Sequence, residues 1–183
     1  MKITRLTFAF LTAVFCLALF SPEPAAAQRR DYLTDAEIEL VRDNQSIDLR
    51  IGVLTKAIDR RLGIIKNEPS KMSEKENSAW GAPPQGTRQQ LLSDIEKLLQ
   101  KAIDDVDEVA ARNMDSKLFP KAMNKLSASC QSYLPQFRMF IDSAADEKER
   151  GTLLGSIEHC NAVIEASAKV PKEVPKEEKK KKN

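Results

Sequence analysis

The chain has 183 residues, of which 42% are hydrophobic and 31% are charged, and its formal net charge is +2. This length and composition indicate one globular domain and exclude a collagen-like or wholly disordered chain. The net charge is too small to indicate a nucleic-acid-binding protein, so we expect no nucleic-acid partner.

The N-terminal segment has the three-part pattern of a bacterial signal peptide. Lys2 and Arg5 precede an apolar run over residues 6–20, and three consecutive Ala follow, ending at Ala27. We expect residues 1–27 to be removed by cleavage after Ala27, which would make the mature protein periplasmic or secreted. A helix over 6–20 would be only about 22 Å long, shorter than the roughly 30 Å hydrocarbon core, so we expect no stable transmembrane anchor.

Helix signals begin soon after the cleavage site. Thr34 and Glu37 form a capping-box pattern, which predicts a helix from Asp35 to about Asp43. Apolar residues then recur at steps of three and four from Ile47 to Ile65. The polar residues between these patterns leave open whether residues 33–66 form one helix or two.

Residues 67–86 are predicted to form a long loop, because Pro, Gly and Ser interrupt the helical periodicity there. The loop contains Trp80, the single Trp of the chain. An aromatic side chain in this setting can anchor the loop on the domain or contact a partner, and both interpretations stay open.

Three further amphipathic helices are predicted. One begins near Thr87 and runs for about 26 residues, the next spans residues 119–144 with a kink expected at Pro135, and the last begins near Asp146. The inward face expected for the last helix consists of Leu153, Ile157, Cys160 and Ile164. Residues 28–168 therefore fit an all-α, antiparallel four-helix-bundle-like domain.

The C-terminal residues 169–183 carry seven Lys against three Glu, with a repeated Val-Pro-Lys-Glu sequence. This composition predicts a disordered basic tail. Such a tail could attract an anionic surface or an envelope protein whose identity the sequence does not indicate.

Cys130 and Cys160 are the two cysteines that remain after the expected cleavage. They lie at equal distances from the turn expected near Ala145, so an antiparallel hairpin would bring them to the same height. Because the compartment outside the inner membrane permits disulfides, the spacing predicts a Cys130–Cys160 disulfide. Two buried free thiols are the alternative.

The residues needed for common catalytic chemistry are sparse. His159 is the single His, and Ser156 one turn before it has no evident orienting acid. A haem held by His159 with Met123 or Met139 stays formally open, although the covalent haem motif Cys-x-x-Cys-His is missing from the sequence. The acidic residues at 104–108 continue a helical pattern and lack the loop spacing of a calcium site. We therefore expect no enzyme, no cofactor and no metal.

Three segments carry a resemblance to known proteins. They are Tyr32-Leu-Thr-Asp-Ala-Glu-Ile-Glu-Leu-Val-Arg-Asp-Asn-Gln, continuing to Asp48-Leu-Arg-Ile; Asp59-Arg-Arg-Leu; and Trp80-Gly-Ala-Pro-Pro-Gln-Gly-Thr. Together they resemble a group of exported bacterial all-α proteins of unassigned function, over about the first half of the mature chain. The resemblance implies the compartment and the fold, and it transfers no catalytic residues. The function expected is a non-enzymatic structural or interaction module of the cell envelope; the alternative is a helical bundle that binds a small ligand, a metal or haem.

Overall fold

The structure is a computed structural model that describes residues 30–68, 72–113 and 117–170. Within these ranges it is helical and contains no strand, so the predicted all-α class is confirmed. All the helices belong to one packing unit that begins at Tyr32. The expected signal peptide (1–27) and all but the first two residues of the expected tail (169–183) lie outside the described residues.

Residues 33–66 form two helices, which answers the question left open by the sequence. These helices are α2 (Asp35–Asp43) and α3 (Ile47–Ile65). The predicted capping box is present at the start of α2, where the Thr34 side chain accepts from the Glu37 amide and the Glu37 carboxylate accepts from the Thr34 amide. At the other end, Asn44 leaves the helical conformation and its side chain donates to the Leu40 carbonyl at 2.7 Å. This side chain satisfies a terminal carbonyl and ends α2.

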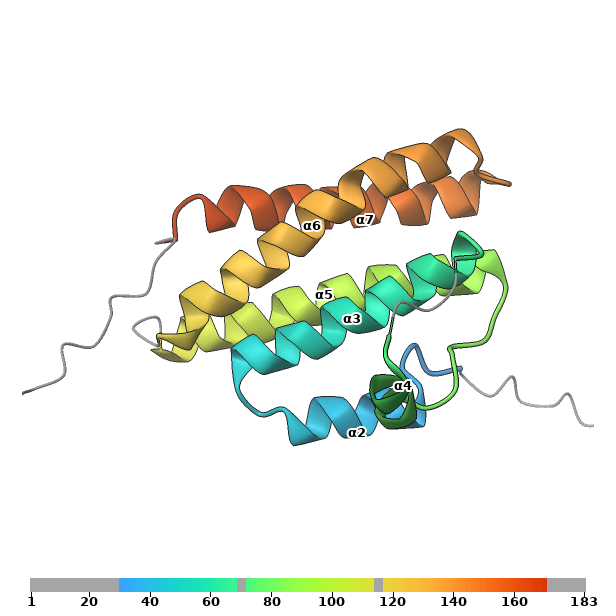
Figure 1. Cartoon of the computed structure of the whole chain (residues 1–183). Helices are drawn as coiled ribbons and strands as arrows, with labels where there is room; N and C mark the ends of the chain where they lie inside the picture. The colour runs from blue at the N-terminus through green and yellow to red at the C-terminus, as the bar shows by residue number, and fades with distance from the viewer. Residues whose placement is uncertain (1–29, 69–71, 114–116, 171–183) are drawn as a thin grey trace, which may run out of the picture. The chain divides into compact units, whose positions relative to one another are not determined.

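Four long helices form the body of the domain: α3, α5 (Arg88–Asn113), α6 (Leu118–Asp142) and α7 (Glu147–Ser167). Helix α3 packs on α5, α5 on α7, α7 on α6, and α6 on α3, so the four helices close a ring. Figure 1 shows that each of these helices runs in the opposite direction to the one before it. Helix α2 lies outside the ring, and among the described helices it packs only on α3 and on the short helix α4 (Glu74–Trp80).

The core lies inside this ring. It is built from side chains that recur at steps of three and four along the helices, as the sequence predicted. Its most enclosed members on the first two long helices are Ile51, Leu54, Ile58, Leu62, Leu92, Ile95, Leu98 and Leu99; Leu126, Tyr133, Phe137, Leu153 and Cys160 come from the last two.

The connection over residues 67–86 differs from the predicted loop because it contains α4. Ser73 and Glu76 form a second capping box, in which the Ser73 side chain accepts from the Glu76 amide and the Glu76 carboxylate accepts from the Ser73 amide. The frequent Pro and Gly on either side concealed this signal. A short helix thus divides the connection into two arms.

Helix α6 includes Pro135 within its span. One detail of α7 differs from expectation. On α7, the fully buried positions include Ser156 and Val163, whereas Ile157 and Ile164 lie at the edge of the core. Ser156 tolerates burial because its hydroxyl donates to the Thr152 carbonyl at 2.9 Å.

Across the part of the chain that is described, no helix has the combination of length and hydropathy needed to cross a membrane.

Candidate functional site

Two adjacent arginines on α3, Arg60 and Arg61, form the centre of a charged cluster between α2, α3, α4 and α5. We call Glu37, Arg60, Arg61 and Asp94 the arginine cluster. Side-chain exposure within it is 0% for Glu37, 10% for Arg60, 1% for Arg61 and 3% for Asp94. Charged groups are rarely enclosed to this degree unless they are paired, so the contacts of each member matter.

Arg61 joins three elements through one guanidinium group. Its two terminal nitrogens bind the Glu37 carboxylate of α2 at 3.1 and 2.9 Å, the fork-on-fork arrangement in which each oxygen accepts from a different nitrogen. The same nitrogens donate to the carbonyls of Ala57 at 2.7 Å and Tyr32 at 2.5 Å. Its Nε lies 3.5 Å from an Asp94 carboxylate oxygen on α5. Arg61 therefore ties the N-terminal segment and α2 to the ring.

Glu37 is the acidic partner on α2. Burial by itself would raise the pKa of this carboxyl, but the hydrogen bond and charge of Arg61, the Thr34 amide and the charge of Arg60 together hold the pKa below its ordinary value. Glu37 is thus a carboxylate in the fold over the whole neutral range. Because Glu37 Oε2 also accepts from the Thr34 amide, one side chain both caps the start of α2 and fixes this helix in place.

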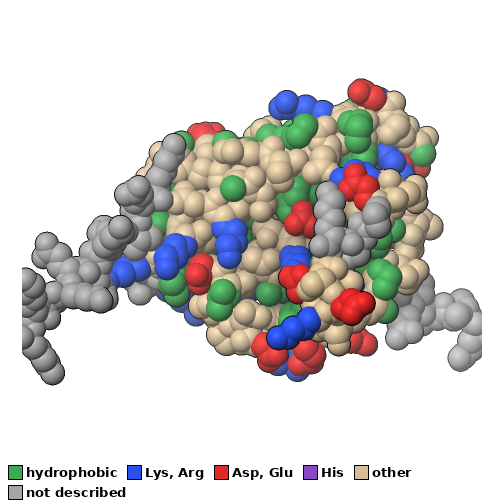
Figure 2. Space-filling model, in the orientation of Figure 1, with side chains coloured by type: hydrophobic (Ala, Val, Ile, Leu, Met, Phe, Trp, Pro, Cys, Tyr) green, Lys and Arg blue, Asp and Glu red, His purple; other side chains and the backbone are tan. Residues whose placement is uncertain are grey.

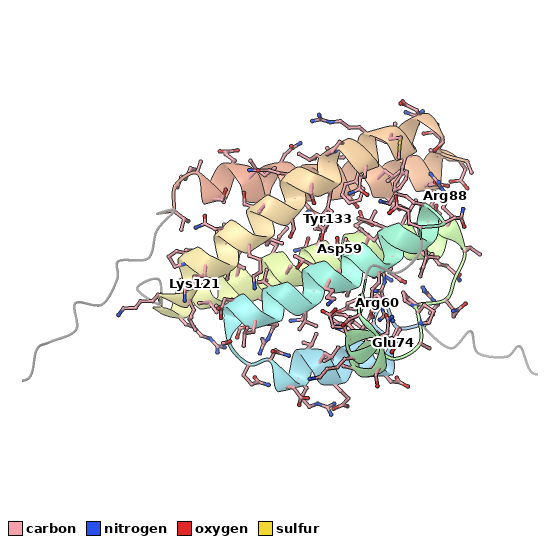
Figure 3. The ribbon with its side chains drawn as sticks, in the orientation of Figure 1. Asp59, Arg60, Glu74, Arg88, Lys121 and Tyr133 are labelled. Carbon is pink, nitrogen blue, oxygen red and sulfur yellow. The ribbon has the colours of Figure 1, made fainter. Side chains whose placement is uncertain are left out.

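Arg60, the neighbour of Arg61 on α3, points toward α4 (Figure 3). It binds Glu37 at 2.7 Å and donates to two successive carbonyls at the end of α4, those of Gly81 at 3.1 Å and Ala82 at 2.8 Å. Its guanidinium carbon also lies 5.4 Å from the centre of the Trp80 ring, within the range of a cation–π contact. Arg60 therefore holds α4 and the segment that follows it against α3.

Trp80 is buried, with 6% of its surface exposed. Lys56 lies over the same ring at 5.5 Å and forms an ion pair of 2.6 Å with Glu76. That hydrogen bond from Lys56, together with the Ser73 amide and hydroxyl, lowers the pKa of Glu76 to about 2. Of the two interpretations of Trp80, the geometry favours the anchor, because the ring faces α3 and leaves little surface for a partner.

Gly81 makes the chain turn directly after the anchor. Its φ of 62° and ψ of −164° fall in a region that is essentially restricted to glycine. A Cβ at this position would also lie 2.9 Å from the Cβ of Ala36 on α2. A glycine is therefore required both for the turn and for the close approach of α2.

A short exposed segment follows α4, next to the arginine cluster. Residues 81–83 and 85–87 are exposed, whereas Pro84 between them is buried. The segment is held at one end by Trp80 and Arg60 and continues at the other into α5 at Arg88. It is thus an exposed loop on a fixed support, the arrangement in which binding loops are commonly found. We call residues 81–87 the exposed turn.

The two predicted disulfide partners are brought together, but as free thiols. Cys130 on α6 and Cys160 on α7 are both fully enclosed. The hydrogen bond to Cys160, reinforced by burial, raises the pKa of the Cys130 thiol well above its ordinary value. The structure therefore contains the alternative foreseen from the sequence, a buried pair of thiols, at the position where the disulfide was predicted.

The other candidates from the sequence are not assembled into a site. The Ser156 hydroxyl is used within α7. On α5, burial raises the pKa of Glu96, and the charges of His159 and Lys97 oppose that rise. Of the two possible haem ligands, Met123 is in the core and Met139 is 55% exposed. Among the described residues, no three His, Cys, Asp or Glu side chains are grouped so that they could hold a metal ion.

Three of the acidic residues at 104–108 interact with neighbouring side chains. Asp104 accepts from Gln100 at 2.7 Å, and Glu108 pairs with Arg112 at 2.6 Å. Asp105 differs from the expected solvated face because it is buried, paired with Lys101 and 3.8 Å from Arg50. The cluster therefore contributes to the surface of α5 and to its contact with α3.

The arginine cluster itself was not predicted. One signal could have indicated it: Asp94 lies between Leu91, Leu92 and Ile95 on the apolar face of its helix, and Arg61 stands beside Leu62 in the apolar pattern of α3. A charge of each sign at core positions predicts a buried pair. The three segments that carried the resemblance all contribute to this cluster, through Tyr32 and Glu37, Arg60 and Arg61, and Trp80 with Gly81.

Comparison with known proteins adds no relative: no family model, no curated protein and no solved structure matches the chain.

Proposed function

We propose that this chain is an exported, non-enzymatic interaction module of the bacterial envelope, and that the exposed turn is its contact surface. The observation that carries the proposal is the construction of the arginine cluster. Its charged side chains are directed inward, to α2, α4 and the backbone at Gly81 and Ala82, rather than toward a substrate. Such an arrangement serves to position a piece of surface, and the piece it positions is residues 81–87.

The composition of the exposed turn and its surroundings suits a polar protein partner. The turn presents Pro83 and Gln85 without a charged side chain of its own. Charged residues surround it on α2 and α4, and Figure 2 shows acidic and basic side chains gathered over these helices. The exposed members are Asp35, Glu39, Arg42, Asp43, Glu74, Lys75 and Glu76. Mixed charges at a rim around a rigid centre are typical of protein–protein contacts.

Export is part of the same proposal. We propose that residues 1–27 are a signal peptide, that the mature protein begins at Gln28 in the periplasm or outside the cell, and that Cys130 and Cys160 become a disulfide there. The pattern of charge, apolar run and small residues supports the first two points, and the facing positions of the two thiols support the third. Intact-mass measurement of the protein recovered from the periplasm tests the cleavage: the expected N-terminus is Gln28, and a retained Met1 would contradict it.

Site-specific photo-crosslinking in living cells tests the interaction. A photoreactive amino acid replaces Gln85 in the exposed turn, and in a matched control it replaces Glu158, an exposed residue on α7. We expect one discrete adduct from position 85 and none from position 158. No adduct from position 85, or equal adducts from both positions, would refute the exposed turn as the contact surface.

The same experiment on a chain ending at Ala168 separates the turn from the basic tail. We expect the adduct at position 85 to persist, because the contact is assigned to the turn. Loss of the adduct would instead assign the association to the Lys-rich tail and its attraction to an anionic surface or protein.

A further inference from the structure

The two buried thiols lie in a closed part of the structure. Cys130 and Cys160 both have 0% exposure and sit at nearly equal distances from the turn that joins α6 to α7. One turn beyond Cys130, the Tyr133 ring is buried as well, and its hydroxyl donates to the Thr55 carbonyl of α3 at 3.0 Å. Figure 3 shows Tyr133 directed toward α3, near Asp59. Helix α3 thus covers the α6 side of the thiol pair, and α5 packs against the α7 side.

This enclosure determines when the thiols can react. Disulfide formation requires a thiolate to attack a sulfur of the oxidant through a mixed-disulfide intermediate, so both ionisation and access are needed. In the folded protein the Cys160 hydrogen bond and burial raise the pKa of the Cys130 thiol, which opposes ionisation. Access is lacking too, because an intermediate attached to either sulfur would have to occupy the filled core between four helices.

We propose that the Cys130–Cys160 disulfide forms only while the α6–α7 hairpin is open, and that packing of α3 and α5 against the hairpin then seals the bond. This inference rests on the disulfide included in the proposed function. In the reaction, the two thiols lose two protons and two electrons to the disulfide of an oxidant, a small-molecule disulfide or a thiol–disulfide oxidoreductase. The oxidant is reduced to two thiols, and one S–S bond replaces another.

The order of events has a consequence for the cell. A chain that folds in the reduced form before it meets an oxidant is oxidised only slowly, and a chain that is oxidised first is reduced only slowly when reductant is added later. The oxidation state of Cys130 and Cys160 therefore depends on whether the compartment in which the chain folded contained an oxidant.

Oxidation of the full-length chain before and after refolding tests the proposal. The chain carries Cys16→Ser, so that Cys130 and Cys160 are its only thiols. It is unfolded and reduced, then refolded in one arm with oxidised glutathione present and in the other arm without oxygen or oxidant. In the second arm oxidised glutathione is added only after refolding is complete. Free thiols are counted by maleimide labelling in denaturant, and intact mass reports the loss of two hydrogens.

We expect the first arm to lose both free thiols and the second to react at least about 100-fold more slowly, because exchange in the folded chain must await an opening event. Equal rates of thiol loss in the two arms would contradict the proposed sealing, whereas the proposed disulfide itself would stand. Two free thiols in both arms would overturn the disulfide as well. A Cys130→Ser chain is the matched control: in the first arm its single thiol should gain glutathione, which shows that loss of two hydrogens needs both cysteines.

Discussion

Helix α3 is joined to its neighbours on its two sides by different interactions. On the side of α2 and α4 the contacts are dominated by Arg60, Arg61 and Glu37. On the side of α6 they are mainly apolar, with hydrogen bonds from Tyr133 to the Thr55 carbonyl and from Lys125 to the Asp48 carbonyl. The reason lies in length. Helix α2 has nine residues and its one fully buried side chain is Glu37, while α6 has 25 residues and contributes nine buried side chains.

The comparison indicates what each kind of interaction is suited to. Long helices bury enough apolar surface to be held by it, at about 25 cal/mol per Å². A short helix buries too little, and a bidentate charge pair can fix its orientation because both atoms of each partner must be aligned. We interpret the arginine cluster as the device that sets the position of α2 and α4, a role that some buried ion pairs have.

Among substitutions at the contacts of α3 with α2 and α4, removal of Arg61 should cause the largest loss of stability. Arg61→Met leaves Glu37 and Asp94 buried without their shared partner, and we expect a loss of about 3–5 kcal/mol in the free energy of unfolding. Chemical denaturation followed by circular dichroism measures this. The matched control is Arg42→Met on α2, where the ion pair with Glu39 is exposed and the expected change is below about 0.5 kcal/mol. Equal effects of the two variants would show that the cluster does not hold α2.

Low pH should weaken the contacts between α2 and α3 in the unsubstituted protein, because it protonates Glu37. The pKa of Glu37 is lower in the fold than in the unfolded chain, so its stabilising contribution is complete above the unfolded pKa of about 4.5 and is lost as the pH falls through the folded pKa. We expect the melting temperature to fall over this acidic range by less than Arg61→Met lowers it, since a protonated Glu37 can still accept hydrogen bonds. The Glu37→Gln protein should lack this part of the pH dependence, and an unchanged profile would contradict the assignment.

The turn after Trp80 should tolerate a side chain poorly. Gly81→Ala places a Cβ in a strained backbone conformation and 2.9 Å from Ala36, and we expect a loss of about 2 kcal/mol. Thermal denaturation gives the loss of stability. Crosslinking at position 85 should weaken in the same protein if the exposed turn is displaced. A melting temperature equal to that of the parent chain would argue against the close contact between the turn and α2.

The smallest expected effects distinguish two glycines on α7. Gly151 has open space around it, so Gly151→Ala should stabilise the helix by about 0.5–1 kcal/mol. A Cβ at Gly155 would collide with the Glu96 carboxylate of α5, and the carboxylate must move. Gly155→Ala should therefore gain less than Gly151→Ala, and adding Glu96→Ala should remove the difference. Equal gains from the two glycines, measured by denaturation, would show that Glu96 moves freely.

The four long helices and their apolar faces were predictable from the sequence, whereas the arginine cluster and α4 were not. Steps of three and four placed α3, α5, α6 and α7, because their periodicity is a direct consequence of helix geometry. The capping box of α2 was identified, but the same signal at Ser73 was concealed by the neighbouring Pro and Gly. Arg60 and Arg61 were missed because a charge in a helical pattern has no partner until the chain folds. Glu37 lies 24 residues from Arg61 in the sequence, and nothing local links the two.

The placement of α2 outside the ring has a consequence for how the domain opens. Because α2 packs only on α3 and α4, it can separate from the ring without exposing the core between α5, α6 and α7. Its amide hydrogens should therefore exchange with solvent deuterium sooner than those at the centres of α5 and α6, through a partial opening. The four long helices would stay packed around the cysteines during such partial openings. Helix α2 can therefore move while the core remains buried.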